Sequence, residues 1–109
     1  MRTLKFIVDG KTIRQDPTSD FNGLFPGRNN DVRAVFDFSP EWNGKIKVAA
    51  FWSMFNIEYP PQLLDEDNSC QIPIEALNRP AFKIQMLGQR RGEPIETNSL
   101  TIYQRGGNV

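Results

Sequence analysis

Residues 31–38, DVRAVFDF, carry an apolar side chain at every second position. A period of two residues is typical of a β-strand that buries one of its faces in a core. The face expected to point inward carries Val32, Ala34, Phe36 and Phe38. The same alternation recurs in FKIQMLG, where one face carries Phe82, Ile84 and Met86. This pattern restricts much of the chain to short, half-buried strands.

The N-terminal segment predicts a hairpin over residues 2–15. Asp9-Gly10 lies between two alternating runs, and this dipeptide readily adopts the positive φ angles of a two-residue turn. The next segment, 16–30, holds two prolines, two glycines and three asparagines, which indicates a long loop. Its apolar side chains are expected to pack against the core: Phe21, Leu24 and Phe25.

The run KIKVAAFW, residues 45–52, fits two kinds of secondary structure. As a strand it places Ile46, Val48, Ala50 and Trp52 on one face. As a helix it would form an apolar stripe through Val48, Phe51, Trp52 and Phe55. Asn43-Gly44 before the run and Pro60-Pro61 after it favour the strand.

Seven to nine short strands follow from these runs and their turns, with at most one helical turn near residues 74–78. This pattern predicts an all-β fold, an antiparallel β-sandwich or else a barrel. The chain of 109 residues is expected to form a single domain, 1–109. Its expected parts are the hairpin 2–15, the loop 16–30, the core sandwich 31–103 and a mobile tail 104–109.

Charge and composition exclude several classes of function. Thirteen basic residues balance thirteen acidic ones, so we expect neither nucleic acid nor a membrane as partner. The chain has no histidine, the commonest general base and transition-metal ligand, and a single cysteine, Cys70, expected to be buried and inert. The first residues lack the pattern of a signal peptide, and no apolar run is long enough to span a membrane.

Catalytic motifs are equally scarce. The sequence contains no G-x-S-x-G, S-x-x-K or phosphate-binding glycine pattern. Two distant carboxylates of a glycosidase remain conceivable but are not favoured. The acidic run Asp65, Glu66 and Asp67 is interpreted as a solvated hairpin tip, with weak calcium binding as the alternative. We therefore expect no enzyme activity and no cofactor.

Aromatic and basic residues on the expected loops are the candidates for an interface. The set comprises Phe21, Phe25, Phe55, Tyr59, Arg79, Arg90 and Arg91. The aromatic residues of 51–59 exceed what one core face readily uses, but core packing is expected for most of them. If a surface patch for protein or sugar forms, it is expected here or on the loop 17–30. The arginines either hold a phosphate or acidic partner or are ordinary loop-tip charges.

Three segments taken together, FDFSPEWNGKIKVAAFW, CQIPIEAL and FKIQMLGQRRGEPIETNSLTI, resemble a known domain. It is the N-terminal domain of baseplate upper proteins and related tail proteins from phages and prophages of Gram-positive bacteria. The likeness covers Val32 to Ile102, but NIEYPPQLL is richer in proline than the equivalent run of that family. The residues that carry this signature are Phe36, Phe38, Trp42, Gly44, Cys70 and Pro73.

The resemblance implies an immunoglobulin-like β-sandwich used for attachment or assembly, without catalytic residues. Trp42 is then expected to cap the end of the core. The expected function is that of a phage or prophage structural protein of the tail, baseplate or capsid, with protein partners and a possible homo-oligomer. The alternative is a small prophage-encoded inhibitor that binds a host defence protein. The expected location is the virion or the host cytoplasm.

Overall fold

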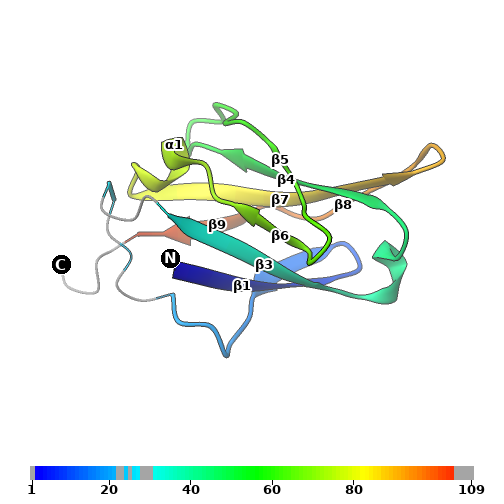
Figure 1. The fold of residues 1–109 in the computed structure, drawn as a ribbon. Coiled ribbons are helices and arrows are strands. Elements are labelled where there is room, and N and C mark those ends of the chain that lie inside the picture. The colour runs from blue at the N-terminus through cyan, green and yellow to red at the C-terminus, as the bar shows by residue number, and fades with distance from the viewer. Residues whose placement is uncertain (1, 22–23, 25, 28–30, 105–109) are drawn as a thin grey trace.

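The computed structural model describes residues 2–21, 24, 26–27 and 31–104 (Figure 1). Its strands are β1 (Arg2–Asp9), β2 (Thr12–Gln15), β3 (Val32–Phe38), β4 (Ile46–Trp52), β5 (Gln62–Leu63), β6 (Ser69–Gln71), β7 (Ala81–Arg90), β8 (Glu93–Glu96) and β9 (Leu100–Tyr103). Two short helices accompany them, the 3-10 turn η1 (Pro40–Trp42) and α1 (Ile74–Leu77). The helical alternative for residues 46–55 is wrong, and the helical turn expected near 74–78 is confirmed.

The strands form two stacked sheets, which confirms the predicted all-β sandwich (Figure 1). Sheet A has the order β2-β1-β3-β6, and sheet B has the order β5-β4-β7-β8 with β9 also pairing β7. β3 and β6 share one sheet while β4 and β7 share the other, as strands B and E and strands C and F do in immunoglobulin domains. β5 lies beside β4, at the place of strand C′.

One pairing departs from the antiparallel expectation. β1 runs parallel to β3, from Arg2 opposite Val32 to Val8 opposite Phe38, while every other described strand pair is antiparallel. A parallel partner needs a long connection, which residues 10–31 supply through β2 and the following loop. β1 therefore lies in the middle of sheet A, and the N-terminal hairpin is part of the sandwich.

The core lies between the inner faces of the two sheets. The expected alternation is confirmed in β1, β3 and β7, whose buried side chains include Leu4, Phe6, Val8, Val32, Ala34, Phe36, Phe82, Ile84 and Met86. Phe6 stacks on Phe36 with ring centroids 5.3 Å apart, and Phe51 contacts Phe82 at 6.2 Å. From the loop after β2, Leu24 is buried and Phe21 meets the edge of Phe6 at 5.5 Å. Phe25 lies outside the described residues.

The face of β4 that carries Ile46, Val48, Ala50 and Trp52 points away from the core, and the opposite face points inward. Ala49 and Phe51 are fully buried, whereas Ile46 is 66% exposed and Val48 is half-buried. From Val48 to Trp52 both faces of this strand are apolar, so alternation alone did not decide between them. The outer face of sheet B consequently carries apolar side chains that the core does not use.

The corner between β3 and β4 closes one end of the core. Trp42 is completely buried, and its Nε1 donates a hydrogen bond of 2.8 Å to the carbonyl oxygen of Gly10. Phe38 packs against the indole with centroids 5.3 Å apart. Gly44 has a φ of 73°, which glycine adopts readily, and this reverses the chain into β4. The structure thus confirms that Trp42 caps the core.

Three further features belong to the second half of the chain. Cys70 is buried on β6, and burial raises the pKa of its thiol to about 12, as expected of an inert cysteine. Pro73 is also buried, directly before α1. In QRRGEP, β7 and β8 continue to a tight turn at Arg91-Gly92, so this segment is mostly strand.

The predicted mobile tail, 104–109, includes one residue that is firmly held. Gln104 is buried, and its Nε2 donates to the carbonyl oxygens of Leu77 and Arg79 at 2.9 and 2.7 Å. These bonds satisfy backbone acceptors at the end of α1. Residues 105–109 lie outside the described part of the chain.

Candidate interface on the outer face of sheet B

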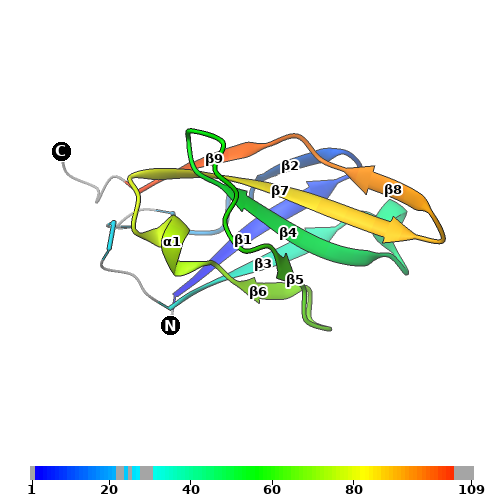
Figure 2. The ribbon, with the colours of Figure 1, turned by 90° about the horizontal axis from the view of Figure 1, so that it is seen from above.

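The outer face of sheet B carries a continuous row of apolar side chains. Cross-strand pairing places Val48 of β4 between Leu63 of β5 and Leu87 of β7. In the next row, Ile46 and Pro94 flank Gln89. We call this set the outer-face patch: Ile46, Val48, Leu63, Leu87 and Pro94. Ile46 and Leu63 are each 66% exposed, so large apolar surface is open to solvent. Figure 2 views the molecule from above, with β4, β7 and β8 running side by side over sheet A.

A groove of about 1100 Å³ adjoins the patch along β8. Ile46, Val48 and Leu87 contribute apolar lining, together with Pro94 and Ile95 from β8. The charged residues that line the groove are Lys11, Arg90, Arg91 and Glu96. With three cations and one anion, the groove favours an apolar occupant that carries negative charge.

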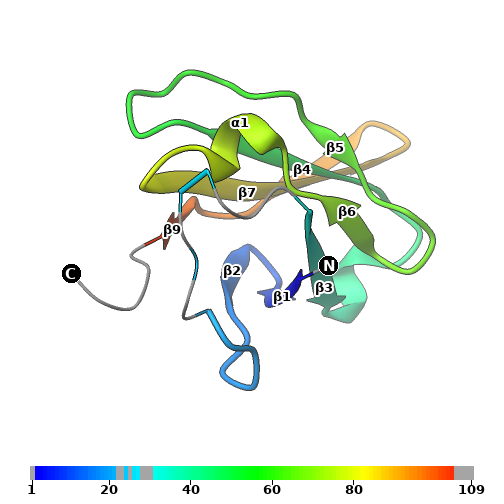
Figure 3. The ribbon, with the colours of Figure 1, turned by 60° about the vertical axis from the view of Figure 1, so that its left-hand side comes forward.

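Apolar side chains also gather at the other end of β4, in the turn that follows it. Met54, Phe55 and Ile57 are 41%, 86% and 62% exposed. We call residues 53–57 the apolar turn. Figure 3 shows the connection from β4 to β5, which contains this turn, arching away from the sandwich.

The apolar turn is held by a buried serine. Ser53 Oγ accepts hydrogen bonds from the backbone N–H groups of Phe55 and Ile57 at 3.1 and 3.0 Å. Asn56 adopts a φ of 63°, and its Oδ1 accepts a bond of 2.9 Å from Lys83 Nζ on β7. Because these bonds hold the backbone of the turn, ordering of the backbone adds little to the cost of binding, and the remaining cost is the rotamer freedom of the exposed side chains.

The aromatic residues singled out in the sequence have different surroundings. Phe55 is at the tip of the apolar turn and is the most exposed large apolar residue described. Tyr59 and Phe21 are half-buried and pack against the core, so neither projects as an anchor. The aromatic content of 51–59 indicated a patch, but not its other members, because Met54, Ile57 and Leu63 look like ordinary core residues in the sequence.

The three arginines do not form one cluster. Arg90 and Arg91 lie in the β7–β8 turn beside the groove, where Arg90 Nη1 approaches Gly44 so closely that a Cβ there would be 2.9 Å away. Arg79 precedes the opposite end of β7, about 30 Å away along a strand of ten residues. Only the first two belong to the groove.

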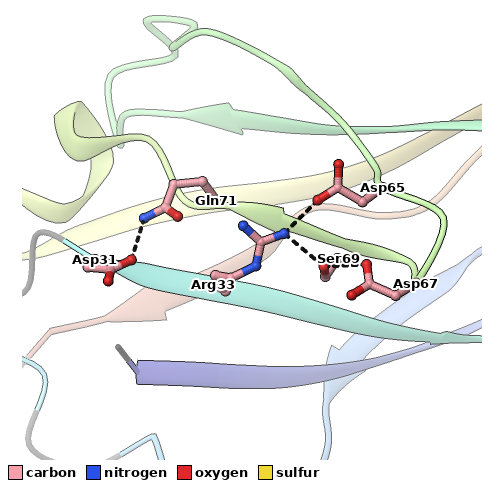
Figure 4. Close-up of polar contacts among 6 residues, drawn as sticks. All are labelled: Asp31, Arg33, Asp65, Asp67, Ser69 and Gln71. Carbon is pink, nitrogen blue, oxygen red and sulfur yellow. Dashed lines mark hydrogen bonds and ion pairs between the residues drawn. The ribbon is translucent and has the colours of Figure 1, made fainter.

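The acidic run forms a polar network at the turn between β5 and β6 (Figure 4). Arg33 Nη2 donates to Asp65 Oδ2 at 2.7 Å and to Ser69 Oγ at 2.9 Å, and Ser69 Oγ donates to Asp67 Oδ1 at 2.6 Å. Asn68 provides the positive φ of 59° that the turn requires. In the described part of the chain, no three Cys, Asp or Glu side chains are grouped so as to hold a metal ion. The network ties β3 to β6 and is interpreted as structural.

None of the described helices has the length and apolar character needed to cross a membrane. Comparison with protein-family models and with curated proteins found no match.

Proposed function

We propose that this chain is a non-catalytic assembly or attachment domain of a phage or prophage virion, bound to other virion proteins in the tail, baseplate or capsid. The observation that supports a binding function is the uncovered apolar surface on sheet B, formed by the outer-face patch and the apolar turn. The virion context is supported by the resemblance of Val32–Ile102 to the baseplate domain.

Exposed apolar surface of this kind favours association. Each Å² of apolar surface removed from water contributes about 25 cal/mol, and monomeric proteins seldom leave large contiguous patches uncovered. Phe55 is 86% exposed and held on a rigid turn, which suits it to anchor an interface. A protein surface is therefore the partner that this part of the molecule fits best.

The proposal is tested by mass spectrometry of purified particles from the host that encodes the chain. We expect the chain in the particles at a fixed ratio to a known structural protein. A Phe55→Ser variant should be incorporated less, whereas Ile74→Ser, which removes an apolar side chain 51% exposed on α1, should be incorporated normally.

A chain that is absent from particles would overturn the virion proposal. If the same chain also retains one host defence enzyme from lysate, and Phe55→Ser abolishes that retention, the function is inhibition of a host protein.

A further inference from the structure

We propose that two copies of this chain pair face to face through sheet B, with the apolar turn of each copy seated in the groove of the other. The inference rests on the proposed function, because it names the partner that the assembly surface takes: a second copy of the chain.

The positions of the turn and the groove carry this inference. The apolar turn begins directly after Trp52 at the end of β4, and the groove contains Ile46 at its start. The six steps between these residues span about 20 Å. The bond from Lys83 Nζ to Asn56 places the turn above the outward side of β7, the same side that exposes Ile46 and Leu87. Both features therefore open on one face.

A two-fold axis uses both features at once. If the axis lies in the plane between two facing sheets and runs across the strands, it places the turn of each copy over the groove of the other. The contact then forms twice and the assembly closes as a dimer, the commonest symmetric arrangement. The row Leu63, Val48 and Leu87 would lie between the two contacts and be covered by its counterpart.

The chemistry of the two features is complementary. Ile46, Val48 and Leu87 give the groove apolar lining, and the turn offers Met54, Phe55 and Ile57. A phenylalanine alone buries about 150–250 Å² when it is covered. At about 1100 Å³, the groove is as large as pockets that enclose whole small-molecule ligands, so it admits several side chains.

Charge favours the same arrangement. Ser53–Leu64, the segment that contains the turn, has one charged residue, the exposed Glu58. Three of the four charged residues that line the groove are cations, including Arg90 and Arg91. Pairing of the turn with the groove brings Glu58 to the cationic rim of the partner's groove, an attraction that Lys83, bound to Asn56 of the turn, partly offsets.

The test is the mass of the full-length chain in solution, measured by analytical ultracentrifugation over a range of concentrations. We expect a reversible dimer that does not grow further. Phe55→Ser in the turn and Ile46→Glu in the groove should each weaken dimerisation at least about tenfold, as expected for anchors of an interface. Both side chains are exposed, so thermal melting should show that the variants stay folded. Ile74→Ser, outside both features, should leave the dimer unchanged.

A mixture of the two variants identifies which surfaces touch. Phe55→Ser retains an intact groove and Ile46→Glu retains an intact turn, so the mixed dimer contains one complete contact where each variant alone contains none. We expect the equimolar mixture to dimerise more tightly than either variant by itself. A mixture no tighter than its components, a wild-type chain that is monomeric at about 1 mM, or growth beyond a dimer would overturn the proposal.

The outcomes separate this inference from the proposed function. A chain that is found in particles but does not pair overturns the dimer and leaves the virion proposal standing. A chain that pairs but is absent from particles overturns the virion proposal and leaves the dimer standing.

Discussion

At the scale of single residues, the indole of Trp42 requires a glycine at position 88, far along the sequence. Gly88 on β7 lies against the indole, and a Cβ added there would be 2.5 Å from Cζ3 and 2.9 Å from Cε3 of the ring. The φ of Gly88 is not in the left-handed region, so the requirement at this position is one of space. A glycine inside a strand marks such a close approach.

Gly88→Ala is therefore expected to lower the free energy of unfolding by about 1–3 kcal/mol through overpacking. Denaturant titration of the single variant gives this value, with the exposed neighbour Gln89→Ala as the control. In a Trp42→Phe background, which removes the ring carbons involved, Gly88→Ala should cost less. Equal costs in both backgrounds would show that the indole is not the obstacle.

Cys70 gives the molecule a predictable response to alkaline pH. Burial raises the pKa of its thiol to about 12, from 9.0 for an unperturbed thiol. Between these values the unfolded chain releases the thiol proton while the folded chain keeps it, so the free energy of unfolding falls as pH rises. We expect this single group to contribute a loss of up to about 1.4 kcal/mol per pH unit above pH 9.

The measurement is denaturant unfolding between pH 8 and 11, with Cys70→Ala as the matched variant. The wild-type chain should lose stability more steeply than the variant, which lacks the thiol but keeps every other titrating group. Parallel curves would mean that the thiol ionises as readily in the folded chain as in the unfolded one.

At the scale of the elements, β4 shows what the sequence can and cannot predict. The alternation in β1, β3 and β7 identified their inward faces because polar residues occupy most of the other positions. In β4 both faces are apolar from Val48 onward, so the pattern indicated a strand but not its orientation. The outer-face patch could not be predicted for the same reason: Ile46, Val48 and Leu87 differ from core residues only in which side of the sheet they occupy.

The apolar turn depends on one hydroxyl group, which gives a prediction at this scale. Ser53→Ala removes the acceptor shared by the amides of Phe55 and Ile57. Loss of hydrogen bonds to a buried side chain costs about 1–1.5 kcal/mol, so hydrogen exchange of these two amides should accelerate about tenfold. NMR exchange rates in an Ile46→Glu background, where pairing does not protect the turn, provide the measurement.

Ser99→Ala is the control for this experiment, because Ser99 is an exposed serine just before β9 and its hydroxyl accepts neither amide. Unchanged exchange of Phe55 and Ile57 in Ser53→Ala would mean that the turn is held by other contacts, such as the bond from Lys83 to Asn56.

At the scale of the whole molecule, the main feature that sequence reasoning missed is the place of β1. The hairpin over residues 2–15 was predicted correctly, although its two-residue turn is Gly10-Lys11 and not Asp9-Gly10. Nothing local to it shows that β1 would pair in parallel with β3. That partnership joins residues about thirty positions apart and is stabilised by side chains that interlock only in the folded sandwich, such as Phe6 on Phe36. The sandwich was predictable from strand patterns, whereas the strand order was not.

The central position of β1 predicts that residues 1–15 are indispensable for folding. Four of their side chains, Leu4, Phe6, Val8 and Ile13, are at most 1% exposed, and full burial of such side chains contributes about 1.5–3 kcal/mol each. Their combined contribution, about 6–12 kcal/mol, is as large as the whole stability of a typical domain, about 5–15 kcal/mol. A chain that begins at Asp16 should therefore be unfolded, with a collapsed amide NMR spectrum.

Adding a synthetic peptide of residues 1–15 should restore the dispersed spectrum, and the same peptide with Phe6→Ser should not, because it cannot stack on Phe36. A truncated chain that is folded without the peptide would show that residues 31–104 form a sufficient core by themselves.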